Sequence, residues 1–269
     1  VADPNLLKNL NRGENDESVF FKATENIRNA GFGKFNIDLM YGFANQSLES
    51  WRHTLEKCVS LRPDYITLYR MRYKLTKISA WAEKVRLIDV MRHSTLARKI
   101  LEESGYFAPF GKNTFCKIDS DDGTSEYLTN RVIYGKPYIG FGLGAQSFLT
   151  SSISYNSGAL GKNLKPYFND LDSGNFPIQD LYDLPVSQII AKMISVSFYF
   201  GGIHLESFTN RFGFPLDAFF RDEIDFLKSK SLMVDSGEWL RLTKKGEKFV
   251  NGVVALFFAP SVKKILLER

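Results

Sequence analysis

The stretch FNIDLMYGFANQSLESWRHTLEKCVSLRPDYITLYRM, from Phe35 to Met71, decides the fold class. It opens with an apolar segment around one Asp and a Gly turn, which is typical of a buried strand. Ser47 can cap a helix, because apolar residues repeat at helical spacing from Leu48 to Val59. A second buried strand, YITLYRM, follows. Strand, helix, strand is the pattern of βα units around a parallel sheet, so we expect an α/β protein.

Helical patterns flank this unit on both sides. Apolar positions from Ser18 onward repeat at helical spacing, and Gly31 can end that helix. A long helix is expected from Ala80 to Ser104, stopped by Gly105. Only two or three βα units are visible, too few for a complete eight-stranded barrel. Either the sheet is small and open, or preceding units are missing.

The pattern changes after Phe107. Residues 107–156 show short extended segments and turns, and 156–180 has the Gly, Asn and Pro content of a connection with one short helix. Helical periodicity returns at 186–199 and 215–230, followed by a strand, a Gly turn, a strand and a helix. We therefore expect a first domain at 1–155, a connection at 156–180 and a winged-helix-like domain at 181–269.

Composition narrows the class of function. The chain has 35 basic and 30 acidic residues, a net charge of +5 that is spread along its length. Scattered charge favours solubility and an anionic ligand over nucleic acid, and the helix expected at 215–230 carries four acidic residues. No apolar run reaches the roughly 20 residues of a membrane span. We expect no nucleic-acid partner and no membrane partner.

The cysteines and the chain start carry further expectations. Cys58 and Cys116 are the only cysteines, and their separation matches no metal-binding spacing, so no metal site is expected from them. Such sparse cysteine favours a reducing cytoplasm. The sequence opens without an initiator Met or a signal-peptide pattern, which suggests a chain entered partway through.

The segment YIGFGLGAQS, from Tyr138 to Ser147, has the outline of a dinucleotide-binding loop, G-x-G-x-x-A. Such a loop must open into a helix and be followed by an acidic residue about 20 positions later. Here SFLTSSISYNSG favours a strand or a loop, and 142–168 contains no Asp or Glu. The segment is therefore better interpreted as a strand end where two backbones pass closely.

Taken together, these segments resemble the oxygen-independent coproporphyrinogen III oxidase-like group of radical S-adenosylmethionine (SAM) proteins. The opening stretch is similar to the family's NIDLIYGLPGQT strand, turn and helix with the strand after it, and YIGFGLGAQS is similar to its YLGLGPGAHS. LLKNLNRGEND, at 6–16, resembles the family's upstream stretch, and 207–254 looks like its C-terminal domain. The likeness covers nearly the whole chain, in the family's order.

The resemblance implies part of a radical-SAM (β/α) barrel followed by a mostly helical, winged-helix-like C-terminal domain. It also implies SAM and a [4Fe-4S] cluster as cofactors. The family's C-x-x-x-C-x-x-C cysteines lie upstream of anything matched here, and neither Cys58 nor Cys116 can replace them. The cluster ligands are thus not in this chain, which is expected to be the C-terminal two-thirds of such a protein or a relative without its front half.

The resemblance also assigns SAM-binding residues. Asp38 matches the family's Asp for the SAM ribose hydroxyls, the alternative being a carboxylate that caps the Gly42 turn. Arg12 matches an Arg near the SAM carboxylate, although alone it would be interpreted as a surface charge. Tyr69 and Arg70 end the next strand and are expected either to line the same cavity or to be ordinary rim residues.

Other positions bear on the substrate. Gly140 and Gly142 are expected beside the SAM and substrate cavity, and no catalytic residue is assigned. The chain departs from the family at 43–44, where Phe-Ala replaces Leu-Pro, and at 73–79, where YKLTKIS replaces PGTPL. Gln146 replaces a common His. These changes fall around the expected substrate mouth and leave the substrate open.

Two functions follow from the resemblance. The first is a radical SAM oxidoreductase or methyltransferase acting on a tetrapyrrole or similar large substrate, with an electron donor as partner, if the upstream cysteine motif exists. The alternative is a non-catalytic haem-binding or haem-chaperone relative, or a cluster-free remnant. His53 and His93 fall on expected helices, and we expect them to be surface residues rather than haem ligands.

Overall fold

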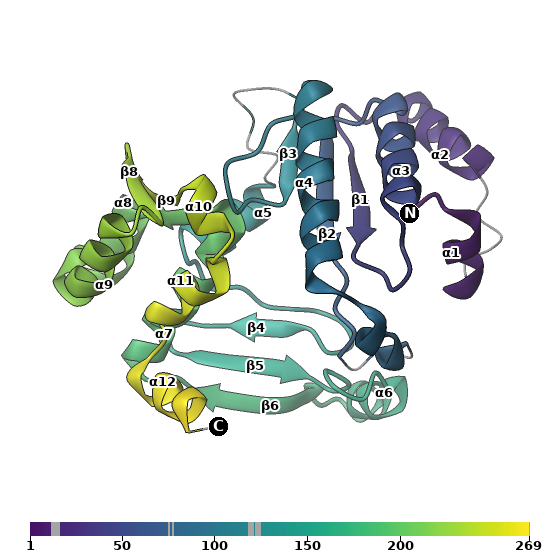
Figure 1. Cartoon of the computed structure of the whole chain (residues 1–269). Helices are drawn as coiled ribbons and strands as arrows, with labels where there is room; N and C mark the ends of the chain where they lie inside the picture. The colour runs from purple at the N-terminus through teal and green to yellow at the C-terminus, as the bar shows by residue number, and fades with distance from the viewer. Residues whose placement is uncertain (12–16, 75, 77, 118–120, 122–124, 269) are drawn as a thin grey trace. The chain divides into compact units, whose positions relative to one another are not determined.

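The computed structural model describes residues 1–11, 17–74, 76, 78–117, 121 and 125–268 (Figure 1). The chain divides into two compact units, unit 1 at Val1–Gly123 and unit 2 at Thr124–Arg269, and each is described by itself. Unit 1 contains the βα repeat, and unit 2 contains two antiparallel sheets with most of the remaining helices.

Unit 1 is built on a three-stranded sheet, sheet A. Its strands are β1 (Asn36–Tyr41), β2 (Tyr65–Arg70) and β3 (Thr114–Cys116), in the order β1-β2-β3. β1 and β2 are parallel, with Asp38 opposite Thr67, while β3 runs antiparallel to β2. The helix α3 (Leu48–Ser60) makes the crossover from β1 to β2. This confirms the parallel strand-helix-strand unit expected from the sequence.

The helices of unit 1 begin where the sequence offers caps. The Ser47 side chain accepts a 3.0 Å hydrogen bond from Ser50 N at the start of α3, as expected. The expected helix near 18–31 is α2 (Glu17–Asn29), and α1 (Pro4–Asn9) precedes it with Asp3 as its N-cap. Capping of this kind satisfies backbone N–H groups that have no partner inside the helix.

The long helix expected from Ala80 is wrong in its first part. A 3-10 turn, η1 (Ser79–Lys84), comes first, and the α-helix α4 spans only Leu87–Glu103. Val85 and Arg86 have extended backbone, with ψ angles of 119° and 130°, which separates the two helical segments. β-branched Val85 favours this break because its side chain loses rotamer freedom in a helix.

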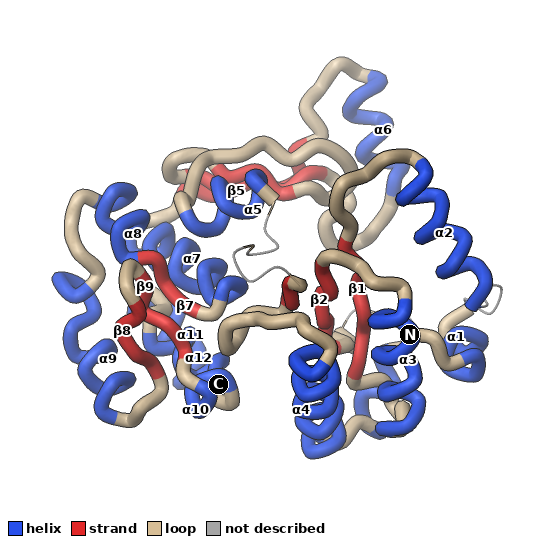
Figure 2. Tube along the Cα trace, turned by 90° about the horizontal axis from the view of Figure 1, so that it is seen from above, coloured by secondary structure: helices blue, strands red, loops and turns tan. Residues whose placement is uncertain are grey.

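The core of unit 1 lies between sheet A and the helices α3 and α4, which lie on the same side of β1 and β2 (Figure 2). Trp51, Leu55, Ile66 and Leu101 are completely or almost completely buried there. Trp51 Nε1 donates a 2.9 Å hydrogen bond to the His93 carbonyl, which joins α3 to α4. The opposite face of the sheet is free to carry polar residues.

The first part of unit 2 contains sheet B, with the order β4-β5-β6. Its antiparallel strands are β4 (Gln146–Phe148), β5 (Ser152–Asn156) and β6 (Ile178–Asp183). The short helical segments α5 (Glu126–Leu128), η2 (Thr129–Ile133) and α6 (Leu164–Asp172) belong to the same part. The sequence does not indicate β6, because this edge strand is mostly exposed and lacks an alternating apolar pattern.

The second part of unit 2 has a winged-helix-like order of elements. The helices expected at 186–199 and 215–230 are α7 (Val186–Ser197) and α9 (Asp217–Ser229). β8 (Met233–Ser236) and β9 (Trp239–Leu242) form the expected hairpin, joined by β7 (Gly202–His204) in the order β7-β9-β8. The remaining elements are η3 (Phe198–Phe200), α8 (Leu205–Phe212), α10 (Lys244–Glu247), α11 (Val250–Leu256) and α12 (Pro260–Leu267).

Candidate functional site

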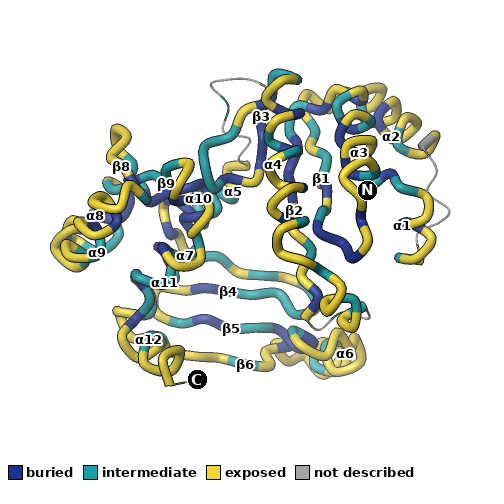
Figure 3. The backbone as a smooth tube through the Cα atoms, viewed as in Figure 1, coloured by how far each residue is buried: buried dark blue, intermediate teal, exposed yellow. Residues whose placement is uncertain are grey.

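Sheet A presents a polar face, defined by Asn36, Asp38, Thr67 and Thr114. Side chains alternate between the faces of a strand, so the apolar residues at 37, 39, 66, 68 and 115 face the helices while these four face away from them. Figure 3 shows β2 buried in its middle part and β1 more exposed. Asp38 is therefore an exposed carboxylate on a rigid strand.

Hydrogen bonds connect this polar face across all three strands. Thr67 Oγ1 donates to Asn36 Oδ1 at 2.9 Å and lies 3.1 Å from Thr114 Oγ1, which then acts as the donor between the two hydroxyls. Asn36 Nδ2 donates to Asp38 Oδ1 at 2.6 Å. Among the residues that the structure describes, Asp38 Oδ2 has no hydrogen-bond partner. One carboxylate oxygen is thus held in place and the other remains available to a ligand.

The register separates Tyr69 from Arg70. Met40 pairs with Tyr69, so the Tyr69 side chain leaves the sheet on the Asp38 side, where it is 38% exposed. Arg70 pairs with Tyr41 and leaves on the opposite side, toward Gly42 and Val90. The structure therefore brings Tyr69, but not Arg70, to the polar face. Arg12 lies outside the described residues.

The loop at the carboxyl end of β1 is held by its own side chains. Gly42 has φ +82°, a conformation that glycine adopts without strain. Gln46 Oε1 accepts hydrogen bonds from Gly42 N (2.9 Å) and Phe43 N (3.3 Å), and Tyr73 OH donates to the Gly42 carbonyl at 3.2 Å. The turn is thus capped by Gln46. Asp38 has no part in it, so the capping alternative for Asp38 is wrong.

A cavity of about 280 Å³ lies beside this loop and contacts both Gln46 and His93. Two buried polar atoms of residues that line it, Gln46 Nε2 and His93 Nδ1, have no hydrogen-bond partner among the described residues. The expectation that His93 lies on the surface is wrong. His93 is only 2% exposed, because α4 packs against the loop. Burial lowers the pKa of His93, which favours a neutral imidazole. His53, in contrast, is exposed on α3 as expected.

The two cysteines do not fit a [4Fe-4S] cluster. Cys58 lies on α3 inside the core, and burial raises the pKa of its thiol to about 12. Cys116 is buried on β3. A cluster needs several thiolates within bonding distance of one another, and a thiol held protonated in an apolar core does not supply one.

The glycine segment of unit 2 leads into strand β4 and not into a helix, which excludes the dinucleotide-loop geometry. A Cβ on Gly140 would lie 2.4 Å from the Gln146 carbonyl oxygen, so two backbones do pass closely there. Gly142 has φ +103°. Asn156 Nδ2 donates to the carbonyls of Gly140 (3.2 Å) and Gly142 (2.9 Å) and closes the segment into a compact loop. This geometry by itself accounts for both glycines.

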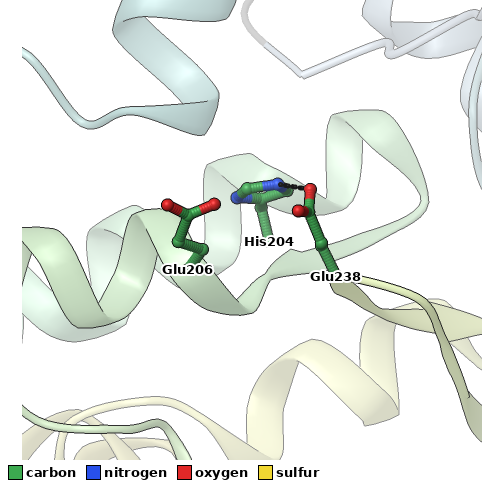
Figure 4. A group of neighbouring side chains, drawn as sticks. All are labelled: His204, Glu206 and Glu238. Atoms are coloured by element: carbon green, nitrogen blue, oxygen red, sulfur yellow. Dashed lines mark hydrogen bonds and ion pairs between the residues drawn. The ribbon is translucent and has the colours of Figure 1, made fainter.

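His204, Glu206 and Glu238 gather at the start of α8 in a group with metal-ligand chemistry (Figure 4). His204 Nδ1 accepts the 3.1 Å hydrogen bond of Ser207 N as the N-cap of α8, so a neutral ring carries its proton on Nε2. That nitrogen lies 3.3 Å from Glu238 Oε2. Neither nitrogen then offers a lone pair to a metal, and the group is a helix cap braced by an acidic residue.

Within the described part of the chain, no helix is both long and apolar enough to cross a bilayer.

The chain is similar to several proteins of known name. No protein-family model matches the chain. It is 27% identical over 266 residues to an oxygen-independent coproporphyrinogen III oxidase of Synechocystis. This match covers 90% of this chain and 55% of that protein. Another of that name, from Thermostichus vulcanus, is 25% identical over 96% of this chain and 83% of the relative. A heme chaperone of Bacillus subtilis is 22% identical over 95% of this chain and 66% of its own length.

The solved structure of coproporphyrinogen III oxidase from Escherichia coli, described as a radical SAM enzyme, matches with a TM-score of 0.70 at 19% identity. The match covers 95% of this chain and 61% of that structure. The expected resemblance to oxygen-independent coproporphyrinogen III oxidase-like radical SAM proteins is thus confirmed. So is the fold class, part of a radical-SAM barrel followed by a mostly helical domain.

Several residues of the site were missed by sequence reasoning. Asn36 stands two residues before Asp38 and so shares its face, which strand alternation could have shown. The same alternation predicts that Arg70 leaves β2 on the face opposite to Asp38. The contact between Thr67 and Thr114 joins residues 47 positions apart, and no local pattern reveals it.

Proposed function

We propose that this chain comes from a radical SAM protein of the oxygen-independent coproporphyrinogen III oxidase-like group and that unit 1 binds SAM. The observation that carries the proposal is the Asp38 carboxylate, exposed on the polar face with one oxygen held by Asn36 and the other available. A carboxylate accepts strong hydrogen bonds from hydroxyl donors, and the adjacent hydroxyls of a ribose supply two.

The residues present fit the nucleoside part of SAM. Asp38 would accept from the ribose hydroxyls, Asn36 would keep the carboxylate oriented, and Tyr69 would line the same face. SAM, when bound, supplies the hydrogen-abstracting or methyl-donating chemistry of such proteins. Cys58 and Cys116 do not fit a [4Fe-4S] cluster, so this chain's own cysteines are assigned no part in the chemistry.

The proposed substrate is a tetrapyrrole or similar large molecule, changed by oxidative decarboxylation or methyl transfer, with an electron donor as partner. The names of the relatives support the substrate class, since two are coproporphyrinogen III oxidases and one is a heme chaperone. The Arg12 contact to SAM, the roles of Gly140 and Gly142 beside the cofactor, and a cytoplasmic location stay predictions.

The direct test is binding of SAM to the purified chain by isothermal titration calorimetry. We expect saturable binding that Asp38→Asn weakens by roughly tenfold or more, the loss expected for charge-assisted hydrogen bonds. Glu56→Gln, an exposed change on α3, is the matched control and should leave the affinity unchanged. If Asp38→Asn and Glu56→Gln bind SAM equally well, Asp38 has no part in a SAM site.

A second candidate is a non-catalytic haem-binding or haem-chaperone-like role, which the similarity to the Bacillus subtilis heme chaperone favours. Titration of the chain with haem, followed through the Soret band, tests it. A saturable spectral shift supports this role, whereas an unchanged haem spectrum removes it.

A further inference from the structure

Three cationic side chains of unit 2 gather over one face of sheet B. Arg131 comes from η2, Lys192 from α7 and Arg211 from α8. Lys192 Nζ lies 4.0 Å from the centre of the Phe148 ring and 5.6 Å from that of Tyr138. Arg131 Cζ lies 4.7 Å from the centre of the same Tyr138 ring. Two cations thus share one aromatic ring.

Among the residues that the structure describes, these three cations have no counter-ion. In the described part of unit 2, neither Lys192 nor either arginine has a carboxylate within ion-pair distance, and the Lys192 ammonium donates no hydrogen bond. Arg211 instead donates to the Thr150 carbonyl at 3.2 Å, and Arg131 to Tyr127 OH at 3.0 Å. Cation–π contacts offset part of the cost of desolvating an ammonium ion, but they satisfy none of its three N–H donors.

The electrostatics at Lys192 are unfavourable as they stand. Burial first, and then the positive charges of Arg131 and Arg211, lower the pKa of Lys192 to about 8. A half-buried ammonium beside two guanidinium groups is unfavourable without an anion, because both desolvation and like-charge repulsion destabilise the folded state. An anion bound among the three side chains would relieve both costs.

The surroundings indicate what would carry that anion. Beside the cations, Tyr138 OH donates to Gln146 Oε1, and Gln146 Nε2 donates to Tyr155 OH at 2.7 Å, so the neighbouring polar groups are neutral and already paired. Beside them, the ring of Tyr127 is 54% exposed, and its centre lies 5.8 Å from Arg131 Cζ. A positively charged centre beside an exposed aromatic ring suits an anion carried on an apolar body.

We propose that Arg131, Lys192 and Arg211 form a binding site for a carboxylate group carried on an apolar body. The Lys192 ammonium and the two guanidinium groups bind the carboxylate, and the exposed ring of Tyr127 contacts the apolar part of the ligand. The inference stands on unit 2 alone. It deepens the proposed function by naming the group of the substrate that is recognised, and it rests on that function only for the identity of the natural ligand.

The test uses the whole chain and a matched pair of fluorescent probes, 1-pyrenebutyrate and the uncharged 1-pyrenebutanol. At pH 7 we expect the carboxylate probe to bind about tenfold more tightly than the alcohol, the factor expected for one charge-assisted hydrogen bond. Lys192→Met should remove most of this preference while leaving the alcohol's affinity unchanged. Lys192→Arg should keep the preference, because it keeps the charge.

Lys228→Met serves as control, since Lys228 lies on α9 and pairs with Asp235 at 2.6 Å. It should bind both probes like the original chain. Equal affinity for the two probes, or a preference that survives Lys192→Met, overturns the proposal. Arg131→Gln gives an independent second variant, and the circular dichroism spectrum of each variant establishes that it is folded.

Two further measurements distinguish the carboxylate site from a phosphate site and from the tetrapyrrole proposal. Glutarate should displace 1-pyrenebutyrate at lower concentration than inorganic phosphate, and the reverse order would overturn the carboxylate assignment in favour of a phosphate site. Coproporphyrin III, which carries four carboxylates, tests the proposed function. If it does not bind while the Lys192-dependent preference for 1-pyrenebutyrate holds, the tetrapyrrole proposal fails and the carboxylate site stands.

Discussion

Thr67 Oγ1 donates a 2.9 Å hydrogen bond to Asn36 Oδ1, and this bond fixes which end of the Asn36 amide faces Asp38. Because the oxygen of the amide accepts from Thr67, its nitrogen is directed to the Asp38 carboxylate. Thr67 is buried in the middle strand of sheet A, whereas Asp38 is exposed at its edge strand. A buried hydroxyl thereby orients an exposed carboxylate that it does not touch.

Replacing Thr67 by Val should test this relationship. The shape is kept, but Thr114 and Asn36 lose a partner, so we expect the free energy of unfolding to fall by about 1–3 kcal/mol. SAM affinity, if Asp38 binds it as proposed, should fall by roughly threefold to tenfold. Urea denaturation and calorimetry measure the two effects. Thr67→Ser keeps the hydroxyl and should restore the affinity, and a Val variant with full affinity would show that orientation of Asp38 does not matter.

Lys192 should make stability depend on pH in a defined window. Its pKa is lowered from 10.5 in the unfolded chain to about 8 in the folded one, so between these values the unfolded chain binds more protons and stability rises with pH. Below pH 8 the ammonium is charged in both states and its full cost remains. Relative to Lys192→Met, the original chain should therefore gain stability from pH 8 to 10.5 in denaturation curves. A constant difference over this range would contradict the lowered pKa.

The cysteines should be chemically inert in the folded protein. Cys58 and Cys116 are both buried, and with a pKa of about 12 only about one Cys58 thiol in ten thousand is ionised at pH 8. We expect iodoacetamide to modify neither residue within an hour at pH 8, and both in urea, as read by mass spectrometry. Rapid native labelling of Cys58 would show that the α3 core opens far more readily than its packing indicates.

The close approach at Gly140 should make that position intolerant of a side chain. A Cβ there would lie 2.4 Å from a backbone oxygen, so Gly140→Ala should lower the free energy of unfolding by about 1–3 kcal/mol or more. Gly142→Ala meets no atom within 4 Å but must hold φ +103°, and a smaller loss of about 1–2 kcal/mol is expected. Gly33→Ala, which has open space and no positive φ, is the control and should change little in thermal unfolding.

Individual elements show which parts of the fold can be predicted from the sequence. The β1–α3–β2 unit follows from local signals, because Ser47 caps the helix and the apolar periods of helix and strand differ clearly. α8 was missed because its N-cap is His204, which is not among the common capping residues. β6 was missed because an exposed edge strand carries no apolar alternation.

The functional residues show the same limit. Asp38 was found through a family resemblance. Thr67, the residue opposite it on β2, lies 29 residues further along the chain, and only the parallel register brings the two onto one face. The group of Arg131, Lys192 and Arg211 comes from three separate elements. Lysine and arginine are ordinary surface residues in any sequence. Only folding reveals that these three lie close together and that no carboxylate of the described residues pairs with them.

Tyr138, Gln146 and Tyr155 form a hydrogen-bonded row of side chains, and the residue in its middle limits proton transfer along it. Gln146 accepts from Tyr138 and donates to Tyr155, so both ends of its amide are committed. An amide neither gains nor loses a proton at physiological pH, whereas a histidine side chain can do both. In this chain Gln146 can orient its two tyrosine neighbours, but it cannot itself act as an acid, a base or a proton relay. A proton needed here comes from another group, such as the Lys192 ammonium 5.6 Å from the Tyr138 ring, from the ligand or from solvent.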